Sequence, residues 1–155
     1  MLFRSSWRRA NAGLNRLRAA LERATGNRFV SVLGGANPGD VRCGFLVSED
    51  GIKVERAVSY AGDLLPKVLS THRLERLSRG PLVIQLSWRD QHVSIVNIHF
   101  KSKYGGGRDP SRLQFELVRM KMAQHLRGLI EGHFLPELLG RDHWFIVVGD
   151  RNSRR

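Results

Sequence analysis

Apolar residues recur at alternating spacings of three and four between Ser5 and Ala24. They are Trp7, Ala10, Leu14, Leu17, Leu21 and Ala24. This period predicts an amphipathic α-helix with one buried face. Ser5 or Ser6 can cap its start, and Gly26 follows as a C-terminal stop. The stripe also fits a heptad repeat, so a short coiled coil is the alternative, but the mixture of Trp and Ala with Leu favours packing on a sheet.

Several runs with the character of β-strands follow this helix. They span residues 28–33, 41–48, 52–59, 82–88 and 91–100. Asp50-Gly51 separates the second run from the third, and Arg89-Asp90 separates the fourth from the fifth. Asp50-Gly51 is a turn signal and predicts a β-hairpin between its flanking strands. The fourth and fifth runs are expected to form a second, hairpin-like pair across Arg89-Asp90. The stretch 60–79 has no clear period and fits one or two helical turns or a packed loop.

A second helix is expected from Asp109 to about Phe134, because Asp109 can cap it and Pro110 suits the first helical position. Its predicted buried side carries Leu113, Leu117, Met120, Gln124 or Ala123, Leu126, Leu129 or Ile130, and Phe134. The apolar run at 144–148 predicts a last strand buried on both faces. The order of elements predicts an α/β (α+β) fold with mostly antiparallel strands.

The length of 155 residues predicts one domain that spans residues 1–155. The single cysteine, Cys43, excludes an intrachain disulfide. The sequence has no transmembrane segment, and its start lacks the apolar stretch of a signal peptide. The predicted location is therefore cytoplasmic or unknown.

The chain is strongly basic, with 26 Lys and Arg against 14 Asp and Glu, a net charge of +12 and a pI near 11.3. Such a charge favours polyanionic partners, with nucleic acid (DNA or RNA) first and anionic membrane surfaces second. An arginine-rich genome is the alternative explanation, because arginine far outnumbers lysine.

Polar residues that could take part in catalysis or binding are concentrated where two apolar strands end. Asn97, His99 and Lys101 alternate on one face of the strand at 91–100. Gly149 ends the last apolar run, and Asp150 and Asn152 follow it. Phosphoester hydrolysis needs a carboxylate to orient water or hold a metal, donors to the phosphate and a proton for the leaving oxygen. These residues supply much of that set without a complete metal site.

These residues resemble motifs of the endonuclease/exonuclease/phosphatase (deoxyribonuclease-like) family. Residues 97–103 resemble its strand of asparagine, any residue, histidine, an apolar residue, lysine and serine, and 149–153 resemble its Gly-Asp-X-Asn-Ser motif. Residues 41–47 resemble the strand before the family's hairpin, and 79–82 resemble its "arginine, any, proline, apolar" segment. The likeness spans roughly residues 14–153.

The resemblance implies a two-sheet β-sandwich with flanking helices and a Mg²⁺-dependent nuclease or phosphodiesterase activity, that is, a hydrolase. It implies catalytic roles for Asp150, Asn152 and His99. It implies substrate-binding roles for Asn97, Lys101 and Ser102. The metal ligand is left unknown, with Asp150 as the candidate.

The sequence departs from the family at both ends. The family's metal-binding glutamate lies in a strand before the first helix, and its Asp-His pair follows the Gly-Asp-X-Asn motif; neither has a counterpart here. Asp142-His143 precedes the last strand, about 20 Å from Asp150 by strand geometry. His72, His92, His125 and His133 show no metal-ligand spacing.

Residues 1–155 are therefore expected to be a central, incomplete part of such a domain. The predicted function is phosphodiester hydrolysis by ancestry, impaired in this chain by itself. A non-catalytic basic module that binds nucleic acid or another polyanion is the alternative. Exposed sheet edges would also favour self-association.

Overall fold

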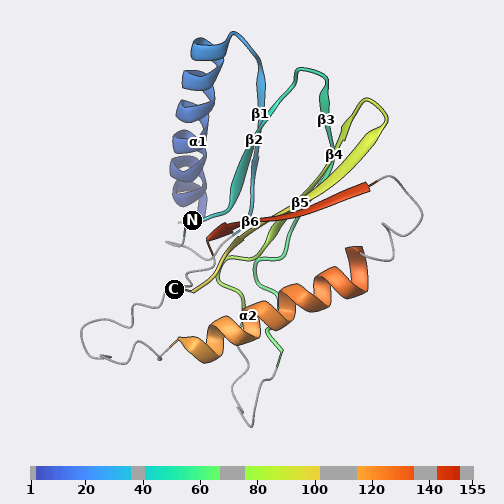
Figure 1. Ribbon diagram of the computed structural model, residues 1–155. Helices are drawn as coiled ribbons and strands as arrows, with labels where there is room; N and C mark the ends of the chain where they lie inside the picture. The colour runs from blue at the N-terminus through green and yellow to red at the C-terminus, as the bar shows by residue number, and fades with distance from the viewer. Residues whose placement is uncertain (1–2, 36–40, 67–75, 102–114, 135–142, 151–155) are drawn as a thin grey trace.

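The computed structural model describes residues 3–35, 41–66, 76–101, 115–134 and 143–150 (Figure 1). The elements, in chain order, are α1 (Phe3–Thr25), β1 (Phe29–Leu33), β2 (Gly44–Ser48), β3 (Ile52–Ser59), β4 (Leu82–Trp88), β5 (Gln91–His99), α2 (Glu116–Leu129), which continues as a π-helical turn (Ile130–Phe134), and β6 (His143–Asp150). Two mostly antiparallel sheets with two flanking helices confirm the predicted α+β fold class.

The first helix covers its predicted range, but it begins before the predicted cap. α1 begins at Phe3, so the predicted cap at Ser5 or Ser6 is wrong. Gly26 ends the helix as predicted, with a positive φ of 73° and its N–H donating to the Glu22 carbonyl at 2.9 Å. The Glu22 carboxylate also accepts the N–H of Phe29 at 3.1 Å, which ties the end of α1 to the start of β1.

The strands divide into two sheets, and this overturns one predicted hairpin. β1 pairs with β2 in a small antiparallel sheet, while β3, β4, β5 and β6 form a four-stranded sheet in that order. The turn at Asp50-Gly51 therefore joins strands of different sheets. Val47 of β2 is buried in a cluster with Ile84 and Leu86 of β4. The chain crosses between layers here because β2 and β3 bury side chains face to face instead of sharing a ladder.

The hairpin predicted across Arg89-Asp90 is confirmed. β4 and β5 are antiparallel, with Trp88 opposite Gln91 and with Arg89 at a φ of 54° in the turn. β5 then pairs with β6 in parallel. Parallel neighbours need a crossover connection, and α2 lies in that connection on the side of the sheet away from β1 and β2 (Figure 1).

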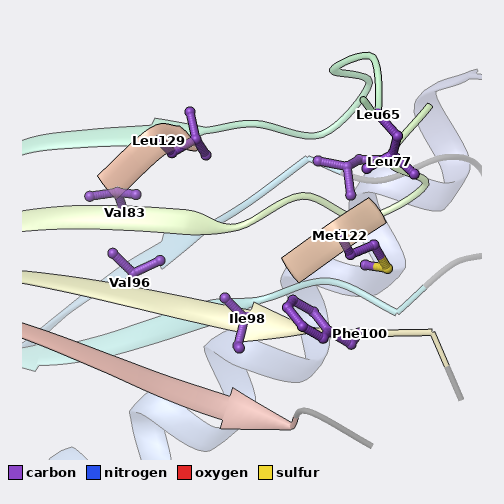
Figure 2. Close-up of a cluster of buried hydrophobic side chains, with 8 residues drawn as sticks. All are labelled: Leu65, Leu77, Val83, Val96, Ile98, Phe100, Met122 and Leu129. Atoms are coloured by element: carbon purple, nitrogen blue, oxygen red, sulfur yellow. The ribbon is translucent and has the colours of Figure 1, made fainter. Parts of the chain in front are cut away.

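The main core lies between α2 and the four-stranded sheet. Figure 2 shows its eight buried side chains: Leu65, Leu77, Val83, Val96, Ile98, Phe100, Met122 and Leu129. Val118, Leu126 and Ile130 of the same helical segment pack against this cluster.

The predicted second helix is correct in kind, and its predicted buried face is correct at Leu126, Leu129 and Ile130 but wrong at Met120. Met120, expected to be buried, is 49% exposed, whereas Met122 is 7% exposed. The stripe that contacts the core therefore runs through Met122 and not through Met120. The described helix begins at Glu116, and the predicted cap at Asp109 and Pro110 lies outside the described residues.

β6 was expected to be buried on both faces, and this is wrong. Trp144, Ile146 and Val148 are 65%, 45% and 41% exposed. β6 is the last strand of the four-stranded sheet in the described part of the chain, and the four-stranded sheet contributes to the inter-sheet cluster through β3, β4 and β5. Phe145, on its other face, packs against the main core. Neither described helix has the length and hydropathy of a membrane-spanning segment.

Candidate functional site

His99 and Asp150 lie side by side at the ends of β5 and β6. They are register partners in the parallel ladder, and the N–H of Phe100 donates to the Asp150 carbonyl at 2.9 Å. Neighbouring strands are about 4.8 Å apart, and paired residues of a ladder project from the same face. The two side chains therefore start from adjacent points on one face. The expected juxtaposition of the two strand ends is present, while the catalytic roles remain predictions.

The face that carries His99 and Asp150 is the one turned toward the small sheet. Asn97, two residues before His99 on this face, donates from Nδ2 to the Gly44 carbonyl of β2 at 3.1 Å. This hydrogen bond spans the two sheets beside the strand ends. The amide of Asn97 is therefore engaged in joining the sheets, and its predicted role in substrate binding is still a prediction.

Gly149 is required for the approach of β6 to β5 at this end. Its φ is 122°, and a Cβ at this position would meet the Ile98 carbonyl oxygen and come within 2.9 Å of Asn97 Oδ1. Only glycine adopts this conformation without strain. The close approach of the two strands therefore explains why position 149 of the 149–153 motif is a glycine.

Arg79 is a site residue that sequence reasoning treated only as part of a motif. Burial lowers the pKa of His99, and the positive charge of Arg79 lowers it further. Burial raises the pKa of the Cys43 thiol, while Arg79 opposes that rise. Arg79 therefore acts on groups of both sheets, at Cys43 just before β2 and at His99 on β5.

The turn that presents Arg79 has a clear cause. A Cβ on Gly80 would meet the backbone of Tyr60 and Ala61, so only glycine permits this close approach. Pro81 follows, and its carbonyl accepts the N–H of Tyr60 at 3.0 Å. An arginine directly before a Gly-Pro pair at the start of a buried strand was the available sequence signal.

The charge state of His99 is set by opposing influences. Burial and Arg79 lower its pKa, and the Asp150 carboxylate raises it. The net shift is downward, so the neutral imidazole gains population near neutral pH. An arriving phosphate would favour the protonated form, because an anion stabilises a neighbouring cation.

Two further cations lie beside Arg79. Arg76, Ser78, Arg79 and Lys101 form the polar lining of a small cavity of about 40 Å³ whose apolar lining includes Leu65, Leu77 and Met122. Arg76 Nη1 donates to the Gly62 carbonyl at 2.8 Å, and Lys101 Nζ lies 4.6 Å from the centre of the Phe115 ring. None of the ion pairs found among the described residues involves these cations.

The described residues do not form a Mg²⁺ site by themselves. Mg²⁺ takes octahedral oxygen ligands, usually one or two carboxylates together with water and substrate phosphate. Asp150 supplies one carboxylate, and the described parts of the chain contain no group of three potential metal-binding side chains. Asp150 could therefore be one ligand of a Mg²⁺ ion but does not complete its coordination.

The other residues considered in the sequence either are not among the described residues or lie away from the ends of β5 and β6. Ser102 and Asn152 are not among the described residues. His143 begins β6, with Nε2 at 2.9 Å from Ser94 Oγ and its ring stacked on His92 at 6.0 Å. His143 and Asp150 are the first and last residues of the eight-residue β6, a span of roughly 23 Å. His143 therefore lies at the opposite end of the sheet, as the sequence predicted.

No protein-family model matches the chain, and no curated protein matches it. It is similar to the crystal structure of D. rerio TDP2 humanized by 14 mutations, with a TM-score of 0.53 and 14% identity over 88% of this chain. It is also similar to D. rerio TDP2 complexed with a single-strand DNA product, with a TM-score of 0.54 and 15% identity over 88% of this chain. The chain spans 45% and 44% of those chains, which is less than half of their length. The likeness shows that the chain shares the fold of the matching part of these TDP2 structures.

Proposed function

We propose that this chain binds the phosphodiester backbone of nucleic acid at the ends of β5 and β6. The observation that carries the proposal is the pairing of His99 with Asp150 at strand ends close to Arg79. Arg79 would clamp a phosphate with its planar guanidinium, and Lys101 would add positive charge. His99 would hydrogen-bond the same phosphate. We include Ser102 and Asn152 among the proposed phosphate-binding residues because they belong to the motifs at 97–103 and 149–153.

Nucleic acid is the favoured ligand because of the charge of the whole chain. A net charge of +12 attracts a polymer of phosphates far more strongly than a single phosphate. One of the similar solved structures holds a single-strand DNA product, which supports DNA as the first ligand to test.

Phosphodiester hydrolysis is the second candidate function. A site built only to bind an anion gains nothing from a carboxylate beside the histidine, whereas a hydrolase uses one to orient the attacking water. Asp150 would have that role, Asn152 would bind phosphate, and His99 would support charge in the transition state. Mg²⁺ is the proposed cofactor of any such activity.

We expect weak or no hydrolysis by residues 1–155 acting by themselves. The described donors do not fit Mg²⁺ without further ligands. We therefore propose that residues 1–155 form one domain that is incomplete as a catalytic unit. We also propose that the chain self-associates through exposed edges of its sheets.

The binding proposal is tested by fluorescence anisotropy with a labelled single-stranded oligonucleotide at two salt concentrations. Arg79→Ala should weaken binding about tenfold, the value of one charge-assisted hydrogen bond to phosphate. Arg28→Ala is the matched control, because Arg28 is 88% exposed and pairs with Glu49 away from the strand ends. Equal losses for both variants would show that binding follows net charge without a site.

Hydrolysis is tested on the same oligonucleotide with and without Mg²⁺. We expect no cleavage above background. Mg²⁺-dependent cleavage that Asp150→Ala abolishes would replace the binding function with the enzymatic one.

A further inference from the structure

The outer face of α1 is basic and contains no acidic residue. It consists of the exposed residues Ala12, Arg16, Ala20 and Arg23, which the helical period places on one side of the helix. Glu22 is the only acidic residue of α1, and the same period places it about 120° away from Arg16. Exposed protein surfaces usually mix charges of both signs. A helix face with charge of one sign therefore favours a ligand of the opposite charge.

The positive charge of this face is not balanced by neighbouring carboxylates. None of the ion pairs found among the described residues involves Arg16 or Arg23. The Glu22 carboxylate lies 4.0 Å from Arg18 Nε and accepts the first backbone N–H of β1. The charge of Arg16 and Arg23 is therefore available to an anionic ligand.

The opposite face of α1 is packed against the small sheet, as Figure 1 shows. Leu14 and Leu21 lie on that side, and both are half-buried. An amphipathic helix binds a membrane surface by burying its apolar face among the lipids. Because β1 already contacts this face, an anionic polymer is a better ligand for α1 than a lipid surface.

A chain of contacts joins α1 to the ends of β5 and β6. A Cβ added to Gly44 would come within 3.7 Å of Leu14 Cδ2, so the two residues lie against each other. The Gly44 carbonyl accepts Nδ2 of Asn97, two residues before His99 on β5. The middle of α1 is therefore separated from the strand ends only by the small sheet.

A further cation lies on the way between these two places. Arg42 lines a hollow of about 390 Å³ together with Gly13 and Leu14 of α1. Cys43 is the next residue in the sequence, and the charge of Arg79 acts on its thiol. Positive charge is thus present at the strand ends, beside the small sheet and on the outer face of α1.

We propose that a nucleic-acid strand bound at the ends of β5 and β6 continues past Arg42 and along the outer face of α1. The inference rests on the function proposed above and adds the course of the bound strand. From Leu14 to Arg23 the helix rises roughly 14 Å, which matches about four nucleotides of a stacked strand. Alanines beside the arginines let the strand approach closely, and each guanidinium can hold a phosphate through two hydrogen bonds.

The contact is tested by alkylation of single cysteines with N-ethylmaleimide, which is neutral and so is not repelled by DNA. A single-stranded oligonucleotide of about 12 nucleotides is long enough to cover both places. Ala20→Cys should react more slowly when the oligonucleotide is bound. Ala57→Cys, exposed on β3 away from α1 (Figure 1), should react at the same rate with and without it. The wild type, whose Cys43 is buried, is the background control.

Fluorescence anisotropy with the same oligonucleotide supplies the second measurement. Arg16→Ala combined with Arg23→Ala should weaken binding at least about tenfold and reduce the slope of log affinity against log salt by about 1.4. Alanine is the best helix former, so α1 should stay folded. Arg56→Ala combined with Arg89→Ala removes the same charge from exposed positions on β3 and in the β4–β5 turn and should change the slope much less.

Two results would overturn the inference while the strand-end site stands. One is Arg79-dependent binding that leaves Ala20→Cys unprotected, and the other is equal protection of Ala20→Cys and Ala57→Cys. Protection of Ala20→Cys by vesicles of anionic phospholipid, but not by the oligonucleotide, would also overturn it. The function proposed above fails by a different result, namely equal losses for Arg79→Ala and Arg28→Ala.

Discussion

His99 and Asp150 are held beside each other by the backbone pairing of β5 and β6. The parallel ladder of β5 and β6 sets them in register, and the hydrogen bond from Phe100 N–H to the Asp150 carbonyl follows directly. Replacing either side chain should therefore leave the other in place. Their electrostatic coupling can be measured apart from the fold.

The pKa of His99 should respond to both of its charged neighbours. Asp150→Asn should lower it further, because the carboxylate stabilises the imidazolium, and Arg79→Ala should raise it. NMR titration of the histidine ring protons measures both shifts, with His99→Gln to assign the signal. Arg76→Ala is the matched control and should leave the pKa of His99 in place. A pKa indifferent to both neighbours would contradict the described site.

Stability should fall in mild acid because of His99. Its folded-state pKa is lower than its unfolded value of about 6.5, so the unfolded chain binds the proton more readily. The free energy of unfolding should decrease as the pH falls through about 6.5 and level off below the folded-state pKa. Urea unfolding at several pH values measures this, and His99→Gln should lose less stability over the same range.

Asn97→Ala should destabilise the packing of the two sheets. The change removes the hydrogen bond to the Gly44 carbonyl and leaves that carbonyl without this donor, at a cost of about 1–2 kcal/mol. Urea unfolding gives the difference. Thr25→Ala removes an exposed hydroxyl that donates to the Leu21 carbonyl and accepts the N–H of Asn27, and it should cost less because water can replace both partners.

Gly149→Ala should be more harmful than Gly26→Ala. Both glycines have positive φ, but a Cβ at Gly26 has open space, whereas one at Gly149 meets the Ile98 carbonyl. Backbone strain costs about 1 kcal/mol at Gly26, and the collision should at least double that at Gly149. Thermal unfolding of the two variants compares them, and equal losses would contradict the close approach of β6 to β5.

The face of α2 that contacts the sheet is tested by its methionines. Met122→Ala should cost about 2–5 kcal/mol, because it leaves a cavity in the main core. Met120→Ala, on the exposed side, should cost less than about 0.5 kcal/mol. Similar losses would show that the helix is rotated from the described position.

The sequence by itself determined the identity and order of most elements and which polar residues stand at the ends of β5 and β6. Helix period, strand alternation and turn residues act over a few positions, so the ranges of α1, β4 and β5 could be predicted from them. Local patterns do not determine which strands become neighbours in a sheet. Asp50-Gly51 is a turn, but whether β2 and β3 pair across it depends on β1 and β4.

Only the tertiary structure decided that β2 pairs with β1, that β6 is the last strand of the described sheet and exposes apolar residues, and that Arg79 lies near His99. Each depends on residues far apart in the chain. An apolar strand tends to be buried, but packing against residues far away in the sequence decides whether it is buried. A guanidinium similarly affects a histidine twenty positions away only when the fold brings them together.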